Sequence, residues 1–177
     1  MAFTIQKDYL TQITQELVRI NSVNPTLTSE GKGEAKIGAY VAEKLKEIGL
    51  EITTSEIAPG RVTVDGTLKG SGGGKSLLLN AHLDTVGVEG MTIDPFSGEL
   101  RENRVYGRGA DDTKASLGVI LALLEALHTQ RSLPGPNVVI GATVDEESGA
   151  TGAPAFAAWL QREGLDIDEI VVAEPTR

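Results

Sequence analysis

A histidine and an aspartate stand two residues apart where an apolar segment of the chain ends. His82 and Asp84 follow residues 77–81, which read Leu-Leu-Leu-Asn-Ala. Side chains at positions i and i+2 of a strand project to the same side. The Asp84 carboxylate can therefore hold one ring nitrogen of His82 while the other nitrogen faces a metal ion.

Acidic residues stand at the ends of other apolar segments and at the start of a long helical pattern. They are Asp145, Glu146, Glu147, Glu174, Asp111 and Asp112. In open α/β sheets, sites form outside the carboxyl ends of the strands, so these acids are expected at one edge. One histidine, several carboxylates and no cysteine describe a site for zinc, cobalt or manganese.

Each of these residues also has a plain structural explanation. Two adjacent glutamates often form a solvated turn, and Asp111 and Asp112 could be helix-start acids worth about 0.3–1 kcal/mol each. His128, the only other histidine, falls in the last turn of the long helix, where it suits the helix dipole. The metal site is preferred because three strand ends and one helix start carry acids at the same edge, and His128 receives no ligand role.

Periodic apolar residues predict the elements that must position these side chains. The expected helices span about 6–20, 33–48, 113–130 and 152–163, and the expected strands span 50–57, 61–68, 76–81, 137–143 and 170–173. The first two strands form a hairpin around Pro59-Gly60. Together they indicate an α/β domain with a mixed, largely parallel central sheet flanked by helices. The glycine-rich segment 70–76 is expected to be a turn, because Lys69 stands where a phosphate loop needs glycine.

Composition narrows the class of protein. A chain of 177 residues with 40% hydrophobic content suits one domain, and a net charge of −9 disfavours nucleic-acid or anionic-membrane partners. No apolar stretch approaches the roughly 20 residues of a spanning helix, and residues 1–8 lack the long apolar region of a secretory signal. A cytoplasmic protein is therefore expected.

Four segments resemble the two-metal amidohydrolase and exopeptidase family of acetylornithine deacetylase, succinyl-diaminopimelate desuccinylase, glutamate carboxypeptidase and aminoacylase. They are 78–86, the pair 94–96 and 106–114, 145–149, and 173–176. The resemblance covers essentially all 177 residues. It implies a zinc-exopeptidase-like catalytic domain that hydrolyses an amide bond in N-acyl amino acids or small peptides.

The resemblance also assigns roles to individual residues. His82 and Glu174 would bind one metal ion, Asp112 would bridge two ions, and Glu147 would bind the second. Asp84 would orient His82, and Glu146 would be the general base. The cofactors implied are two divalent ions, zinc first, with cobalt or manganese as alternatives. The alternative function is a catalytically silent metal-binding or interaction domain, although retention of Asp84 and Glu146 argues against it.

The chain is shorter than members of this family, which insert a lid or dimerisation domain after the last of these motifs. They then return to the catalytic domain and supply a final histidine ligand. Residues 1–177 are therefore expected to be the N-terminal portion of the catalytic domain, with an exposed sheet edge and no lid. The second ion, left with Asp112 and Glu147, should bind more weakly, and activity should be low or absent. Full-length relatives would dimerise through the lid.

Overall fold

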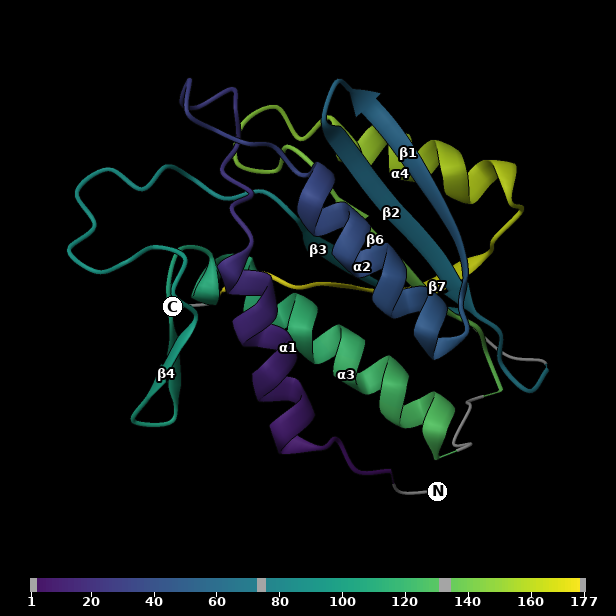
Figure 1. Cartoon of the computed structure of the whole chain (residues 1–177). Helices are drawn as coiled ribbons and strands as arrows, with labels where there is room; N and C mark the ends of the chain where they lie inside the picture. Colours follow the sequence, from purple (N-terminus) through teal and green to yellow (C-terminus); the bar gives the residue numbers. More distant parts are fainter. Residues whose placement is uncertain (1–2, 73–75, 131–134, 176–177) are drawn as a thin grey trace.

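A five-stranded sheet forms the centre of the molecule. The computed structural model describes residues 3–72, 76–130 and 135–175. The sheet consists of β1 (Glu51–Ala58), β2 (Arg61–Leu68), β3 (Ser76–His82), β6 (Val138–Thr143) and β7 (Ile167–Val172). The helices are α1 (Lys7–Arg19), α2 (Ala35–Ile48), α3 (Ala115–Thr129) and α4 (Gly152–Arg162), as Figure 1 shows.

The order of strands in the sheet is β1-β2-β6-β3-β7. β1 pairs antiparallel with β2, and β2 with β6, whereas β3 runs parallel to both β6 and β7. The mixed α/β fold and the first hairpin are thus confirmed. Because β3, β6 and β7 are mutually parallel, their carboxyl ends lie at one edge, and that is where the acidic residues were expected.

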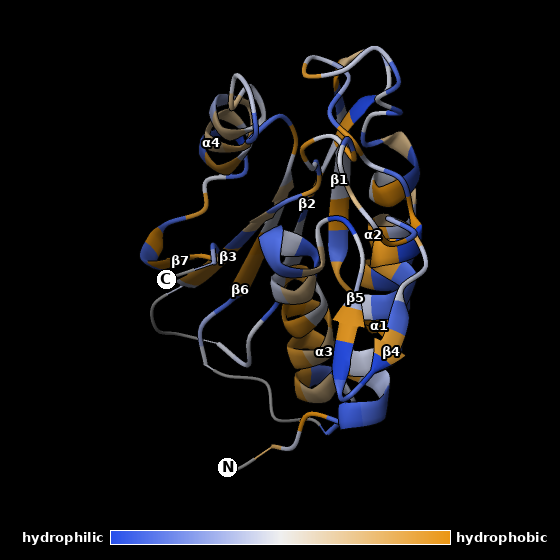
Figure 2. Cartoon of the chain, turned by 90° about the vertical axis from the view of Figure 1, so that its left-hand side faces the viewer, coloured by the Kyte–Doolittle hydropathy of each residue, from blue (hydrophilic) through white to orange (hydrophobic). Residues whose placement is uncertain are grey.

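The helices cover the sheet unequally. Figure 2 shows α4 on one face and α1, α2 and α3 on the other. Neighbouring residues of β3 face opposite sides of the sheet. Leu79 belongs to the large core beneath α1, α2 and α3, whereas Leu78 packs with Phe156 and Trp159 of α4. α3 is the most apolar helix because it contacts α1, α2 and β3, and Leu117, Leu121 and Leu124 have no exposed surface.

Local sequence explains where the helices begin and end. α2 ends at Gly49, which takes the left-handed conformation with φ of 94°, as its position after the apolar pattern predicts. α3 was expected to begin at residue 113 but begins at Ala115. The backbone of Asp112 and Thr113 is not helical, and both lie in a turn labelled η1 (Ala110–Lys114). Asp111 and Asp112 therefore precede the helix and do not cap it with their side chains.

Two further features lie at the periphery. β4 (Glu99–Arg101) and β5 (Arg104–Tyr106) form a small separate hairpin that the sequence pattern did not predict. β7 is the last strand of the described sheet and pairs with β3 alone, as expected for an open edge, and Ile170 and Val172 are 62% and 58% exposed. Of the glycine-rich segment, residues 73–75 lie outside the described residues. Across residues 3–72, 76–130 and 135–175, no helix is both long and apolar enough to span a membrane.

Candidate metal centre

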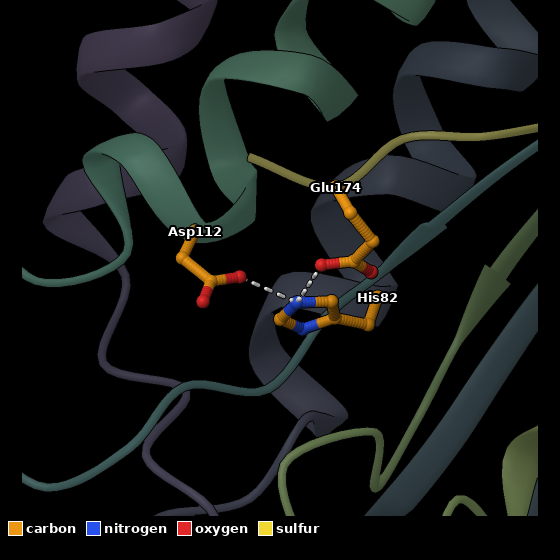
Figure 3. Close-up of side chains that lie close together, drawn as sticks. All are labelled: His82, Asp112 and Glu174. Carbon is orange, nitrogen blue, oxygen red and sulfur yellow. Dashed lines mark hydrogen bonds and ion pairs between the residues drawn. The ribbon is translucent and has the colours of Figure 1, made fainter. Parts of the chain in front are cut away.

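Three side chains from three separate elements converge at the carboxyl edge of the sheet. Nε2 of His82 lies 2.9 Å from Oδ1 of Asp112 and 3.9 Å from Oε2 of Glu174. One donor atom from each residue lies within 4.8 Å of the others, as Figure 3 shows. His82 is 1% exposed, whereas the side chains of Asp112 and Glu174 are 48% and 40% exposed. The group can therefore receive a cation from solvent on one side.

Hydrogen bonds fix the segments that carry the two carboxylates. The Thr113 hydroxyl donates to the backbone oxygen of Ala173 at 2.8 Å, which ties the Asp112 turn to the segment bearing Glu174. The backbone N–H of Ala173 donates to the backbone oxygen of Asn80 in β3 at 2.9 Å. These hydrogen bonds thus hold the segments that bear Asp112 and Glu174 against β3, the strand that carries His82.

The turn before Asp112 depends on close packing. Gly109 has φ of 76°, and a Cβ there would lie 2.6 Å from Cγ2 of Thr85. The buried Lys114 crosses beneath the same turn, and its Nζ donates to the backbone oxygen of Ile20 at 2.7 Å. The peptide bond between Asp112 and Thr113 is cis. The segment 107–109, which reads Gly-Arg-Gly, therefore supports the turn that carries Asp112.

Asp84 is buried, and both its main chain and its carboxylate lie near His82. Nδ1 of His82 lies 2.9 Å from the backbone oxygen of Asp84 and 3.6 Å from its carboxylate, which is ion-pair distance. The carboxylate also accepts hydrogen bonds from the Asn24 amide at 2.7 Å and from the backbone N–H groups of Glu146 and Glu147 at 3.0 and 3.2 Å. Asp84 thus contacts the His82 ring on one side and the main chain of Glu146 and Glu147 on the other.

Glu146 and Glu147 differ in their relation to the three converging residues. Oε2 of Glu146 lies 4.0 Å from Nε2 of His82, and its side chain is 50% exposed. Glu147 is not a member of the His82 group in the described part of the chain. Burial, together with the charge of Asp112, raises the pKa of the Glu147 carboxyl. The two adjacent acids therefore differ in their distance from His82.

The electrostatics of this site favour positive charge. Burial by itself lowers the pKa of His82, but Asp84 and Asp112 outweigh it and raise that pKa to about 9. Burial and the charges of Glu146 and Asp112 raise the pKa of Glu174, although His82 opposes them. Crowded acids around one imidazole nitrogen are relieved by a cation. One nitrogen and several oxygen donors fit zinc, cobalt or manganese.

Two residues that were considered in the sequence but given no ligand role are Asp111 and His128. Asp111 is exposed. His128 is also exposed, in the last turn of α3, and the 15 residues of this helix separate it from the Asp112 turn by about 20 Å. A cavity of about 300 Å³ adjoins the site, with Glu146 and Glu174 at one side and Val144, Ala153 and Val172 among its apolar walls.

Sequence reasoning missed a set of buried polar residues beneath the site. Asn24, Glu34 and Arg61 contact one another or the acids Asp84 and Asp145. Asn24 and Glu34 have no exposed surface, and Arg61 is 8% exposed. A lone arginine at the start of a strand and an asparagine before a proline carry no local signal of such a role.

Comparison with known proteins gives a consistent result. Succinyl-diaminopimelate desuccinylase of Leptothrix cholodnii is 31% identical over 171 residues, covering 93% of this chain and 43% of that protein. Carboxypeptidase G2 of a Pseudomonas species is 32% identical over 179 residues, covering 99% of this chain and 40% of that protein. The chain thus spans about 40% of the length of these relatives.

Solved structures share the fold over nearly the whole chain. An M20 family metallo-carboxypeptidase from Sulfolobus solfataricus superposes with a TM-score of 0.79 at 22% identity, covering 93% of this chain and 37% of that one. A tripeptidase from Staphylococcus aureus superposes with a TM-score of 0.76 at 26% identity, covering 98% and 44%. The sequence model of one family matches residues 78–177, which include all six predicted site residues. On this evidence of motif, fold and sequence, the chain belongs to peptidase family M20/M25/M40.

Proposed function

We propose that this chain carries the residues for metal-dependent hydrolysis of an amide bond in N-acyl amino acids or small peptides. The observation that carries the proposal is the convergence of His82, Asp112 and Glu174 within 4.8 Å, with Glu146 4.0 Å from the same ring nitrogen. Relatives named as a desuccinylase and a carboxypeptidase support this class of reaction.

The residues divide into ligands and a proton carrier. His82 and Glu174 would hold a first divalent cation, Asp112 would be shared between two cations, and Glu147 would hold the second. Bound divalent cations polarise a scissile carbonyl and lower the pKa of water. A carboxylate oxygen of Glu146 takes the proton of the attacking water and returns it to the nitrogen of the leaving amine. The half-exposed position of Glu146 suits this role because it leaves the oxygen free to face substrate.

Zinc is the cation that we propose first, with cobalt and manganese as alternatives. The site containing His82 has the one imidazole ligand and the closest carboxylate, Asp112 at 2.9 Å. The site shared by Asp112 and Glu147 has carboxylates alone among the residues that we assign. We therefore propose unequal affinities, with the second cation bound more weakly.

A calorimetric titration of the chain with zinc or cobalt tests the metal site. Wild-type protein should bind at least one ion, and His82→Ala should lose the tight binding event. His128→Ala is the matched control, because it removes the chain's only other histidine from an exposed position at the far end of α3. Equal binding by the wild type and the His82 variant would contradict the assignment.

Hydrolysis of N-acetyl and N-succinyl amino acids and of dipeptides then tests the reaction. Glu146→Gln should retain the tight metal and lose about 10²–10⁴-fold in kcat, since it removes the general base without removing a proposed ligand. Metal binding without turnover by the wild type would favour the alternative of a catalytically silent metal-binding domain.

A further inference from the structure

Buried beneath the candidate metal centre is a continuous set of hydrogen-bonded polar side chains, here called the Asn24 network. Its members are Asn24, Glu34, Arg61, Asp84 and Asp145. None is more than 8% exposed. The network joins the segment after α1, the start of α2, the first residue of β2 and the segments that follow β3 and β6. It therefore connects parts of the chain that lie far apart in the sequence.

Asn24 occupies the central position because its amide faces two carboxylates. Nδ2 of Asn24 donates to Oδ2 of Asp84 at 2.7 Å and to Oδ1 of Asp145 at 3.1 Å. Its Oδ1 accepts the backbone N–H of Thr26 at 2.9 Å, which leaves only the amino group to face the acids. An amide with two hydrogens thus satisfies two buried acids at once.

The main chain of Asn24 is anchored as firmly as its side chain. Its backbone N–H donates to the backbone oxygen of Thr85 at 2.9 Å, and the N–H of Thr85 donates to Ser22 at 3.2 Å. The segment that carries Asn24 is therefore held directly against the segment that carries Asp84. This anchoring keeps the side-chain amide from following the carboxylates if they shift.

Arg61 fixes the other side of the network. Its guanidinium donates to both carboxylate oxygens of Glu34 and, at 2.9 Å, to Oδ1 of Asp145. Glu34 in turn accepts the backbone N–H of Asp145 at 3.2 Å. Asp145 has φ of 67°, an uncommon conformation for a residue with a side chain. Its contacts hold the sharp turn by which the chain leaves β6 and enters Glu146.

We propose that Asn24 is a positioning residue, which sets Asp84 against Asp145 and thereby fixes the main chain that carries Glu146 and Glu147. The last link is the pair of backbone N–H groups of Glu146 and Glu147, which donate to Asp84 at 3.0 and 3.2 Å. Asn24 touches neither a proposed ligand nor the proposed base. Its effect on catalysis rests on the function proposed above, but its effect on the backbone does not.

Amide hydrogen exchange measured by NMR in the presence of chelator tests this backbone effect without metal or activity. In Asn24→Ala, exchange at the Glu146 and Glu147 amides should quicken by about fivefold or more, as loss of a hydrogen bond to a charged group implies. Exchange at the β6 amides should stay within about twofold of wild type, since the sheet does not use Asn24.

Asn21→Ala is the matched control, because Asn21 lies in the same segment and its side chain accepts the nearby N–H of Val23 and does not contact Asp84 or Asp145 in the described part of the chain. It should leave the Glu146 and Glu147 amides unchanged. The proposal is overturned if Asn24→Ala leaves these two amides as protected as in wild type. It is equally overturned if they quicken only in step with the β6 amides, since that outcome means a general loss of stability.

Two more variants keep the test decisive. Asn24→Asp has nearly the same shape but sets a third carboxylate against Asp84 and Asp145, so it should quicken the two amides more than Asn24→Ala does. If Asn24→Ala does not fold, Asn24→Ser replaces it, because its short hydroxyl cannot span both carboxylates. In a separate zinc titration, Asn24→Ala should bind about tenfold more weakly than wild type. Absence of zinc binding by the wild type would defeat the proposed function and leave the exchange result to decide this inference.

Discussion

Two sets of carboxylates meet at the carboxyl edge of the sheet, and they differ in burial and in hydrogen bonding. The inner set, Glu34, Asp84 and Asp145, is at most 5% exposed and is filled with hydrogen bonds from Arg61, Asn24 and the main chain. The outer set, Asp112, Glu146 and Glu174, has side chains 40–50% exposed. His82 lies between the two sets and contacts both.

The two sets also differ in what holds their charges. Burial alone raises the pKa of Asp145, but hydrogen bonds from Asn24, Thr151 and Arg61 outweigh it and lower that pKa to about 2. The pKa of Glu174 is raised by burial and by neighbouring acids. A carboxylate whose lone pairs are already occupied cannot bind metal, whereas a crowded and half-solvated one gains by doing so. Burial and hydrogen bonding separate the two sets, whereas the pKa alone does not, since burial raises the pKa of Glu34 in the inner set as well. We expect the inner set to support the fold and the outer set to be available to a cation.

The largest effect on stability is expected from removing Arg61, the buried cation that binds Glu34 and Asp145 of the inner set. Arg61→Met leaves Glu34 and Asp145 buried without their guanidinium and should lower the free energy of unfolding by about 3–5 kcal/mol. Urea denaturation of wild type and variant measures the difference. The control is Lys69→Met, which breaks the exposed ion pair of Lys69 with Glu51 and should change stability far less. Equal losses in the two variants would refute the distinction between inner and exposed charges.

Adding a cation should act on the outer set alone. Zinc at about 100 times its Kd should raise the free energy of unfolding by about 2.7 kcal/mol, because the folded state binds it and the unfolded chain does not. Thermal melts with zinc and with chelator measure this shift. The rise should vanish in His82→Ala and persist in His128→Ala. A melt that does not move on chelation of zinc-loaded wild type would count against the metal site.

The fold could be predicted from sequence to the extent that its signals are local. Amphipathic spacing predicted a helix over 6–20, and α1 spans Lys7–Arg19; Pro59-Gly60 correctly marked the turn between β1 and β2. The β4-β5 hairpin was missed because strands of three residues are too short to show alternation. Its turn is formed by Glu102 and Asn103, with φ of 51° and 62°. Of these two residues, only the asparagine is a type that favours this left-handed conformation.

The site divides in the same way. His82 and Glu174 were predicted because each stands beside a strand end that sequence pattern can locate. The pattern marked Asp111 and Asp112 alike at the helix start, and the family resemblance selected Asp112. The structure brings His82, Asp112 and Glu174 together. The Asn24 network was not predicted, because its contacts join residues far apart in the chain. Asn24 meets Asp145 across 121 positions and Arg61 meets Glu34 across 27. Only the folded arrangement shows that these side chains share one buried space.

Asp65 offers a third situation, an acid as buried as the inner set but without its partners. It is 1% exposed, its Oδ1 has no hydrogen-bond partner within the described residues, and burial raises its pKa from 3.8 to about 7. The folded state therefore holds a proton that the unfolded chain releases. Stability contributed by protonated Asp65 is complete below about pH 3.8 and is lost as pH rises to about 7.

Asp65→Asn should remove this loss because an amide does not ionise. In wild type, each pH unit within the window costs up to about 1.4 kcal/mol, and the variant should show a shallower slope. Urea denaturation at a series of pH values from 4 to 8 provides the measurement. Asp166→Asn, which alters an exposed acid, should keep the wild-type slope. Identical slopes in wild type and Asp65→Asn would mean that the buried carboxyl has found a partner.

The smallest expected effect is an increase in stability, and it concerns Glu147, which belongs to neither set. Burial and the charge of Asp112 raise the pKa of Glu147, so its ionised form costs folding energy when no cation is present. Glu147→Gln should therefore raise the metal-free stability, by about 0.5 kcal/mol given its partial exposure, and should weaken binding of the second cation. Chemical denaturation in chelator measures the first effect, with Glu43→Gln on the exposed face of α2 as the control. A loss of stability in Glu147→Gln would contradict this expectation. It would mean that the Glu147 carboxylate already has hydrogen-bond or ion-pair partners in the metal-free protein and supports the fold, as the inner set does.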